Sequence, residues 1–79
     1  MITEAIYLEL IPYRAELFAW CVARANVSGD KLRALGALRQ KIYNDKKPIN
    51  YSCRGCVDSF MRDLYNLLKA YENTISKQP

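Results

Sequence analysis

The last third of the chain carries one long apolar stripe with the spacing of an α-helix. From about residue 53 to residue 75, large apolar side chains recur every three or four positions, so they line one face of a helix with 3.6 residues per turn. A stripe of this length has to be covered by other elements of the fold. Its members are Val57, Phe60, Met61, Leu64, Leu67, Leu68, Tyr71 and Ile75.

Two further segments, over residues 3–25 and 29–43, have apolar faces that match this stripe. In the first, Pro12 lacks a backbone donor and clashes with the preceding turn, so a helix must kink or restart there. In the second, Gly36 indicates that either another stretch of backbone comes close or the helix is locally weak. The apolar positions are Ile6, Leu10, Tyr13, Leu17 and Cys21 in the first segment and Leu32, Leu35, Leu38 and Ile42 in the second.

These patterns predict an all-α fold, a small three-helix bundle whose first helix is kinked or split at Pro12. The helices are expected over about 3–25, 29–43 and 53–75, in a single domain over residues 1–79, because 79 residues suffice for one core. Charged residues interrupt the apolar N-terminal third and we see no signal peptide, so we expect a cytoplasmic protein with no membrane partner.

Basic residues concentrate on the second helix and in the loop after it. If the second and third helices pack antiparallel, this loop gathers positive charge beside Tyr43 and Tyr51, where phosphates would be attracted and unpaired bases could stack. A solvated basic turn is the alternative, and the net charge of +4 fits both interpretations. The predicted nucleic-acid-binding residues are Ser28, Arg33, Gln40, Lys41, Lys46, Lys47 and Arg54.

The segment 22–35 matches a known turn pattern, in which a small residue precedes Gly-Val-Ser and an aliphatic residue follows. Val27, Ser28 and Leu32 match as they stand, with Val22 in place of the small residue and Asn26 in place of the glycine. In this the segment resembles the core of a helix-turn-helix DNA-binding unit. The resemblance implies that Ser28 and Arg33 face the major groove and its phosphates. A plain interhelical turn is the alternative.

A C-x-x-C motif, Cys53-Arg54-Gly55-Cys56, opens the third predicted helix. A thiol at a helix N-terminus beside an arginine favours its thiolate, which points to a redox-sensitive role for Cys53 and Cys56. Zinc is a second interpretation, but two thiolates leave it two ligands short and the chain has no histidine. In a third interpretation of the motif, both cysteines act as small apolar residues or form an occasional local disulfide. We expect reduced thiols, no metal and no cofactor.

The stretch from Tyr43 to Leu68, with its polar basic loop and its C-x-x-C at the start of the last helix, looks like small proteins encoded by bacteriophages and prophages. This resemblance implies DNA handling, virion assembly or obstruction of a host protein. We expect no enzyme, since the chain has no histidine, no glycine-rich phosphate loop and no facing pair of carboxylates.

The first helix carries more large apolar side chains than one small core hides. Tyr7, Ile11, Phe18 and Trp20 are therefore candidate interface residues for a protein partner or a homodimer. The sequence as a whole predicts a non-enzymatic binding module with nucleic acid as its leading partner. A helical protein-interaction or assembly module is the alternative.

Overall fold

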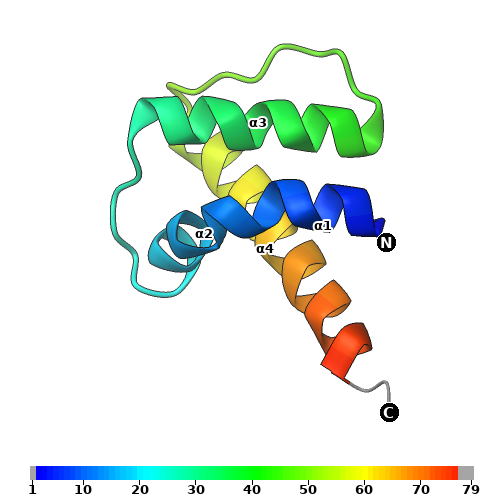
Figure 1. Ribbon diagram of the computed structural model, residues 1–79. Helices are drawn as coiled ribbons and strands as arrows, with labels where there is room; N and C mark the ends of the chain where they lie inside the picture. Colours follow the sequence, from blue (N-terminus) through cyan, green and yellow to red (C-terminus); the bar gives the residue numbers. More distant parts are fainter. Residues whose placement is uncertain (1, 77–79) are drawn as a thin grey trace.

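The computed structural model describes residues 2–76, and every regular element in this range is helical (Figure 1). The predicted all-α class is confirmed. The second predicted helix has the expected bounds, and the last one begins and ends one residue later than expected. The elements are α1 (Glu4–Leu10), the 3-10 helix η1 (Ile11–Tyr13), α2 (Arg14–Cys21), α3 (Gly29–Tyr43) and α4 (Arg54–Ser76).

The first predicted helix corresponds to three elements, because η1 stands between α1 and α2. Thr3 caps α1, since its hydroxyl oxygen accepts a hydrogen bond of 3.3 Å from the backbone N–H of Ile6. Pro12 lies within η1, near the start of that short helix, where its missing N–H leaves no donor unsatisfied. The kink at Pro12 and the three-helix bundle themselves stay predictions.

The helical path ends at Cys21, four residues before the predicted end at residue 25. Arg24 has a φ of 56°, in the left-handed region that ends many helices. The backbone N–H groups of Ala23 and Ala25 bond back to the carbonyls of Phe18 and Ala19, at 3.2 and 2.8 Å. The chain therefore folds over the last turn of α2 instead of extending it.

The apolar stripe of α4 is the centre of the core, as predicted. Along this stripe, Val57, Phe60, Met61, Leu64 and Leu68 are buried and Leu67 is half-buried, whereas Ile75 near the end of the helix is 43% exposed. The other three α-helices contact α4, and α2 makes the most extensive contact. The buried apolar residues are Ile2, Leu10, Leu17, Leu35, Val57, Phe60, Met61, Leu64 and Leu68.

The connection from α3 to α4, residues 44–53, runs back along α3 (Figure 1). Asn44 ends α3 in the left-handed conformation, and the side-chain amide of Gln40 then donates a hydrogen bond of 2.6 Å to the carbonyl of Lys47. Figure 1 shows α4 starting at the opposite end of α3 and crossing it at a steep angle. The antiparallel arrangement that would have gathered the basic residues beside this loop is therefore not the one that the structure shows.

Gly36 marks the place where this returning loop touches α3. A Cβ atom at Gly36 would collide with the hydroxyl of Tyr51 and lie 3.0 Å from Cδ1 of Ile49. The sequence offered a close backbone segment or a locally weak helix as the explanation, whereas the close neighbours in the structure are the side chains of Tyr51 and Ile49. By contrast, a Cβ at Gly55 would meet no atom within 4 Å.

Gly36→Ala is expected to lower the free energy of unfolding, because overpacking costs about 1–3 kcal/mol and outweighs the gain of about 1 kcal/mol in helix propensity. Gly55→Ala, with open space around it, should raise the unfolding free energy by about 0.5–1 kcal/mol. Urea denaturation followed by circular dichroism measures both. Tyr51→Phe should lessen the cost of Gly36→Ala. If Gly36→Ala and Gly55→Ala change the free energy of unfolding equally, the close contact at Gly36 is not what excludes a side chain there.

Candidate functional site

The predicted nucleic-acid-binding residues of α3 and its N-cap lie along the whole helix, and three of them, Arg33, Gln40 and Lys41, have partners within the chain. Nζ of Lys41 is 2.9 Å from Oε2 of Glu9, and the amide of Gln40 is bound to the Lys47 carbonyl. Ser28 and Arg33 are exposed near the start of α3, where Nη1 of Arg33 is 4.0 Å from Oδ1 of Asp30. The outer face of α3 therefore presents less free positive charge than its sequence indicates.

The loop residues Lys46 and Lys47 are exposed, and Lys47 lies beside the first turns of α4. There it lines a depression of about 330 Å³ between the loop and α4, the loop hollow. This places Lys47 on one side of the start of α4. The loop hollow is lined by Arg39, Asp45, Lys47, Pro48, Ile49, Asn50, Cys56, Ser59 and Phe60.

A second depression, of about 410 Å³, lies between the C-terminal end of α2 and the first turns of α4. Three of its lining residues are arginines and one is an aspartate, so it carries an excess of positive charge. We call it the arginine hollow. It is lined by Trp20, Arg24, Ala25, Arg54, Gly55, Asp58 and Arg62. Sequence analysis identified Arg54 as a binding residue but missed Arg24 and Arg62.

Asp58 organises the arginine hollow by hydrogen bonding on both of its oxygens. Oδ1 accepts a bond of 3.0 Å from the indole Nε1 of Trp20, and Oδ2 accepts one of 2.8 Å from Nε of Arg62. The hydrogen bond from Trp20, followed by that from Arg62, lowers the pKa of Asp58 below its ordinary value. The guanidinium carbon of Arg54 lies 5.4 Å from the centre of the Trp20 ring, within cation–π range.

Because the Asp58 carboxylate is shared by Trp20 and Arg62, the excess charge of the hollow comes from Arg24 and Arg54. These two residues reach the site from different segments, Arg24 from the turn after α2 and Arg54 from the first position of α4. The i,i+4 spacing of Asp58 and Arg62 was visible in the sequence. Nothing in the sequence indicated that the turn after α2 would lie beside them.

The four candidate interface residues divide into two pairs. Tyr7 stacks on Tyr71 with ring centres 4.5 Å apart and donates to Glu72 at 3.2 Å, and Trp20 is held by Asp58. Ile11 and Phe18, by contrast, are 42% and 50% exposed. Two further apolar side chains, Leu8 at 59% and Val22 at 51%, are exposed on the same helical segment.

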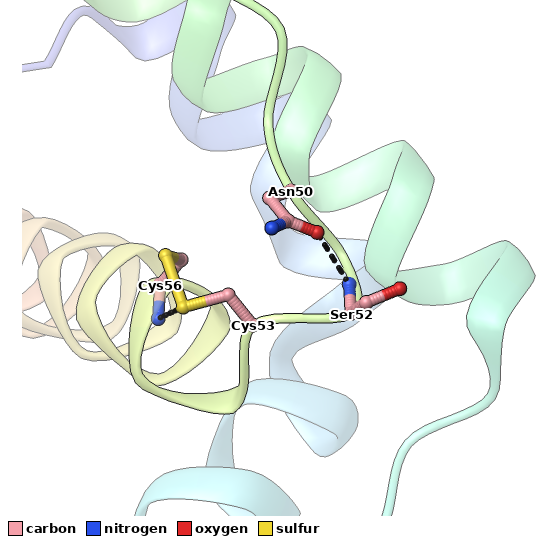
Figure 2. Close-up of a disulfide and its surroundings, with 4 residues drawn as sticks. All are labelled: Asn50, Ser52, Cys53 and Cys56. Atoms are coloured by element: carbon pink, nitrogen blue, oxygen red, sulfur yellow. Dashed lines mark hydrogen bonds between the residues drawn. A yellow bond between two sulfur atoms is a disulfide. The ribbon is translucent and has the colours of Figure 1, made fainter.

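Cys53 and Cys56 form a disulfide, with Cα atoms 5.2 Å apart (Figure 2). We expected reduced thiols, and the difference has a simple geometric reason, since the turn at the start of α4 brings the two residues within the usual disulfide range. Cys21 is a free thiol whose pKa is raised by burial. Within residues 2–76, no group of three or more metal-ligating side chains comes together.

Of the two tyrosines considered for base stacking, Tyr51 is half-buried, whereas Tyr43 is 47% exposed. The Arg39 guanidinium lies 5.0 Å from the centre of the Tyr43 ring, and the Tyr51 ring meets Phe60 edge-on with centres 6.1 Å apart.

The segment that resembles a helix-turn-helix unit has as its turn the seven-residue connection 22–28, and Val22 lies one residue beyond α2. That resemblance stays a prediction.

Comparisons with family models, curated proteins and solved structures found no match for this chain. None of the helices in the described part of the chain combines the length and apolar content that a bilayer crossing needs.

Asp58 should make the hollow sensitive to acid. Because its folded pKa lies below the ordinary value of 3.8, its contribution to stability is complete above that value and is lost as the pH falls through the lower folded pKa. Trp20 is the only tryptophan, so its fluorescence should change as the pH is lowered below 3.8. Asp58→Asn should remove most of this change, and an unaltered acid transition would contradict the assignment.

Proposed function

We propose that this chain is a small, non-enzymatic, cytoplasmic nucleic-acid-binding module whose phosphate contacts centre on the start of α4. One observation carries the proposal. Arg24 and Arg54, from separate segments, line one hollow with Arg62 and Trp20, while the only carboxylate lining it is already hydrogen-bonded on both oxygens. Guanidinium groups that are not neutralised bind phosphate oxygens through paired N–H donors.

The start of α4 extends this positive surface on both sides. Gly55 and Arg54 line the arginine hollow, and the neighbouring Cys56 lines the loop hollow together with Lys47. The N-terminus of a helix adds a partial positive charge at the same place. A phosphate backbone crossing the start of α4 would therefore meet Arg24 and Arg54 first and Lys47 next, with exposed Lys46 beyond.

A flexible single strand suits this surface better than a rigid duplex, because it must bend around a helix end to reach both hollows. The outer face of α3, with Ser28 and Arg33, extends the same interface in the proposal. This is a more modest role than the groove recognition implied by the helix-turn-helix resemblance. Lys41, which is paired with Glu9, and the internally bonded Gln40 contribute little.

Replacing Arg24 or Arg54 by glutamine is expected to weaken binding of a fluorescein-labelled single-stranded oligonucleotide, measured by anisotropy. Each lost phosphate contact should lower the slope of log K against log salt by roughly 0.7, measured between about 50 and 200 mM salt. Lys69→Gln is the matched control. It removes the same charge from an exposed position of α4 outside both hollows.

If all three variants bind alike, the interaction reflects net charge and the arginine hollow is not the site. If the unaltered protein fails to shift either an oligonucleotide or a duplex at low salt, nucleic-acid binding is excluded as its function. A duplex of the same length, measured in parallel, tests the preference for single strands.

Assembly is a second candidate function, favoured by the exposed apolar residues of the first segment. In this proposal α1, η1 and α2 act as one helix bent at Pro12, which we call the rod, and together with α3 and α4 it forms a three-helix bundle. Along this rod the exposed residues follow each other at steps of three or four, the spacing with which two helices pair. This stripe consists of Leu8, Ile11, Ala15, Phe18 and Val22. A second copy of the chain, presenting the same stripe, is the proposed partner.

Sedimentation equilibrium tests this second candidate. The chain should form a dimer whose dissociation constant rises about ten-fold in Phe18→Gln, because an apolar anchor is lost from the centre of the contact. Ile75→Gln is the control, since Ile75 is 43% exposed but lies on α4, away from the stripe. A monomer at all concentrations would exclude the dimer.

A further inference from the structure

The Cys53–Cys56 disulfide brackets the residue that the proposed function depends on. Arg54 and Gly55 are the two residues between the bonded cysteines, and both line the arginine hollow. Cys56 itself lines the loop hollow. The bond therefore lies at the junction of the two depressions, at the first turn of α4.

Without the disulfide, this turn has only weak local support. The carbonyl of Cys53 accepts the first helical hydrogen bond, from Val57 at 3.0 Å, which makes Cys53 the N-cap residue. Its Sγ also accepts a bond of 3.2 Å from the N–H of Cys56 (Figure 2). Sulfur is a weaker acceptor than the hydroxyl or carboxylate oxygens that usually cap helices.

Two further features make the turn dependent on the covalent bond. Gly55, its second residue, contacts nothing within 4 Å of its Cβ position and has the greatest backbone freedom of any residue type. The preceding segment is a short turn, held by the hydrogen bond from the N–H of Ser52 to the Asn50 side chain at 3.0 Å (Figure 2). Opening the disulfide would let the first turn fray and release Arg54 from its place over Trp20.

We infer that the Cys53–Cys56 pair is a redox switch on the affinity of this surface for nucleic acid. The inference rests on the proposed function. In the disulfide form the first turn of α4 is closed, Arg54 is held against Trp20 and the phosphate backbone is bound. In the dithiol form the turn is loose and binding is weak.

The reductant is a dithiol, either small or protein-borne, of the class that keeps cytoplasmic thiols reduced. One of its thiolates attacks Sγ of Cys56, the more exposed of the two residues, and forms a mixed disulfide while Cys53 leaves as a thiolate. The helix N-terminus and neighbouring Arg54 stabilise that leaving thiolate. The second thiol of the reductant then displaces Cys56, so that two electrons and two protons pass to the pair and the reductant becomes a disulfide.

The experiment compares oligonucleotide affinity of the oxidised and reduced protein by anisotropy. Reduction should weaken binding by about five-fold or more, the usual scale of coupling between two sites. Cys53→Ala/Cys56→Ala should bind like the reduced protein in either condition. Alanine is chosen because a serine at position 53 would supply a good cap and rebuild the turn. The control Cys21→Ala should keep the full redox response.

Linkage provides a second measurement. If the disulfide strengthens binding by some factor, bound oligonucleotide must favour the disulfide over the dithiol by the same factor, and titration in a dithiol buffer measures this shift. Trp20 fluorescence should also change on reduction in the absence of any oligonucleotide.

Failure of the oxidised protein to bind the oligonucleotide rejects the proposed function and the switch with it. Equal affinity of both forms, or tighter binding by the reduced form, rejects the switch alone.

Discussion

Burial of the apolar stripe of α4 is the interaction on which the rest of this structure depends. Each large apolar side chain taken out of water contributes about 1.5–3 kcal/mol, and a chain of this size has few other means of offsetting the entropy lost when the backbone is ordered. The stripe is covered from several sides, most extensively by α2. The position of every surface residue on α2 and α4 follows from this packing.

The arginine hollow is a direct consequence. Packing α2 on α4 brings Trp20 to the edge of the core, where its ring is half-buried and its N–H needs a partner. Asp58, one turn into α4, supplies that partner. Since α2 ends just beyond Trp20, the turn that follows must pass over the same edge, and Arg24 lies there. The core contact alone therefore accounts for the positions of Trp20, Asp58 and Arg24 in this hollow.

Local patterns predicted the elements whose limits are set by neighbouring residues. The bounds of α3 and the buried stripe of α4 could be predicted because apolar spacing and capping are short-range signals. The end of α2 was missed because Arg24 adopts a left-handed conformation without a glycine to mark it. The course of the long loop depends on Tyr51 meeting Gly36, and the hollow depends on the turn that carries Arg24 lying beside the first turns of α4. Contacts of that kind are set by tertiary packing, which spacing along the sequence does not encode.

An aspartate inside the proposed anion-binding surface opposes anion binding by its charge, yet the geometry makes it useful. Asp58 neutralises Arg62 but fixes Trp20, and Trp20 in turn positions Arg54. The remaining excess charge is modest and is divided between two hollows. A single phosphate would gain little from either hollow alone, whereas a chain of linked phosphates would occupy both and gain from the high effective concentration of the second contact. Under the proposed function, an arrangement of this kind would select for a polyanion over a small anion, and the short turn between the hollows would be the most sensitive point of the surface.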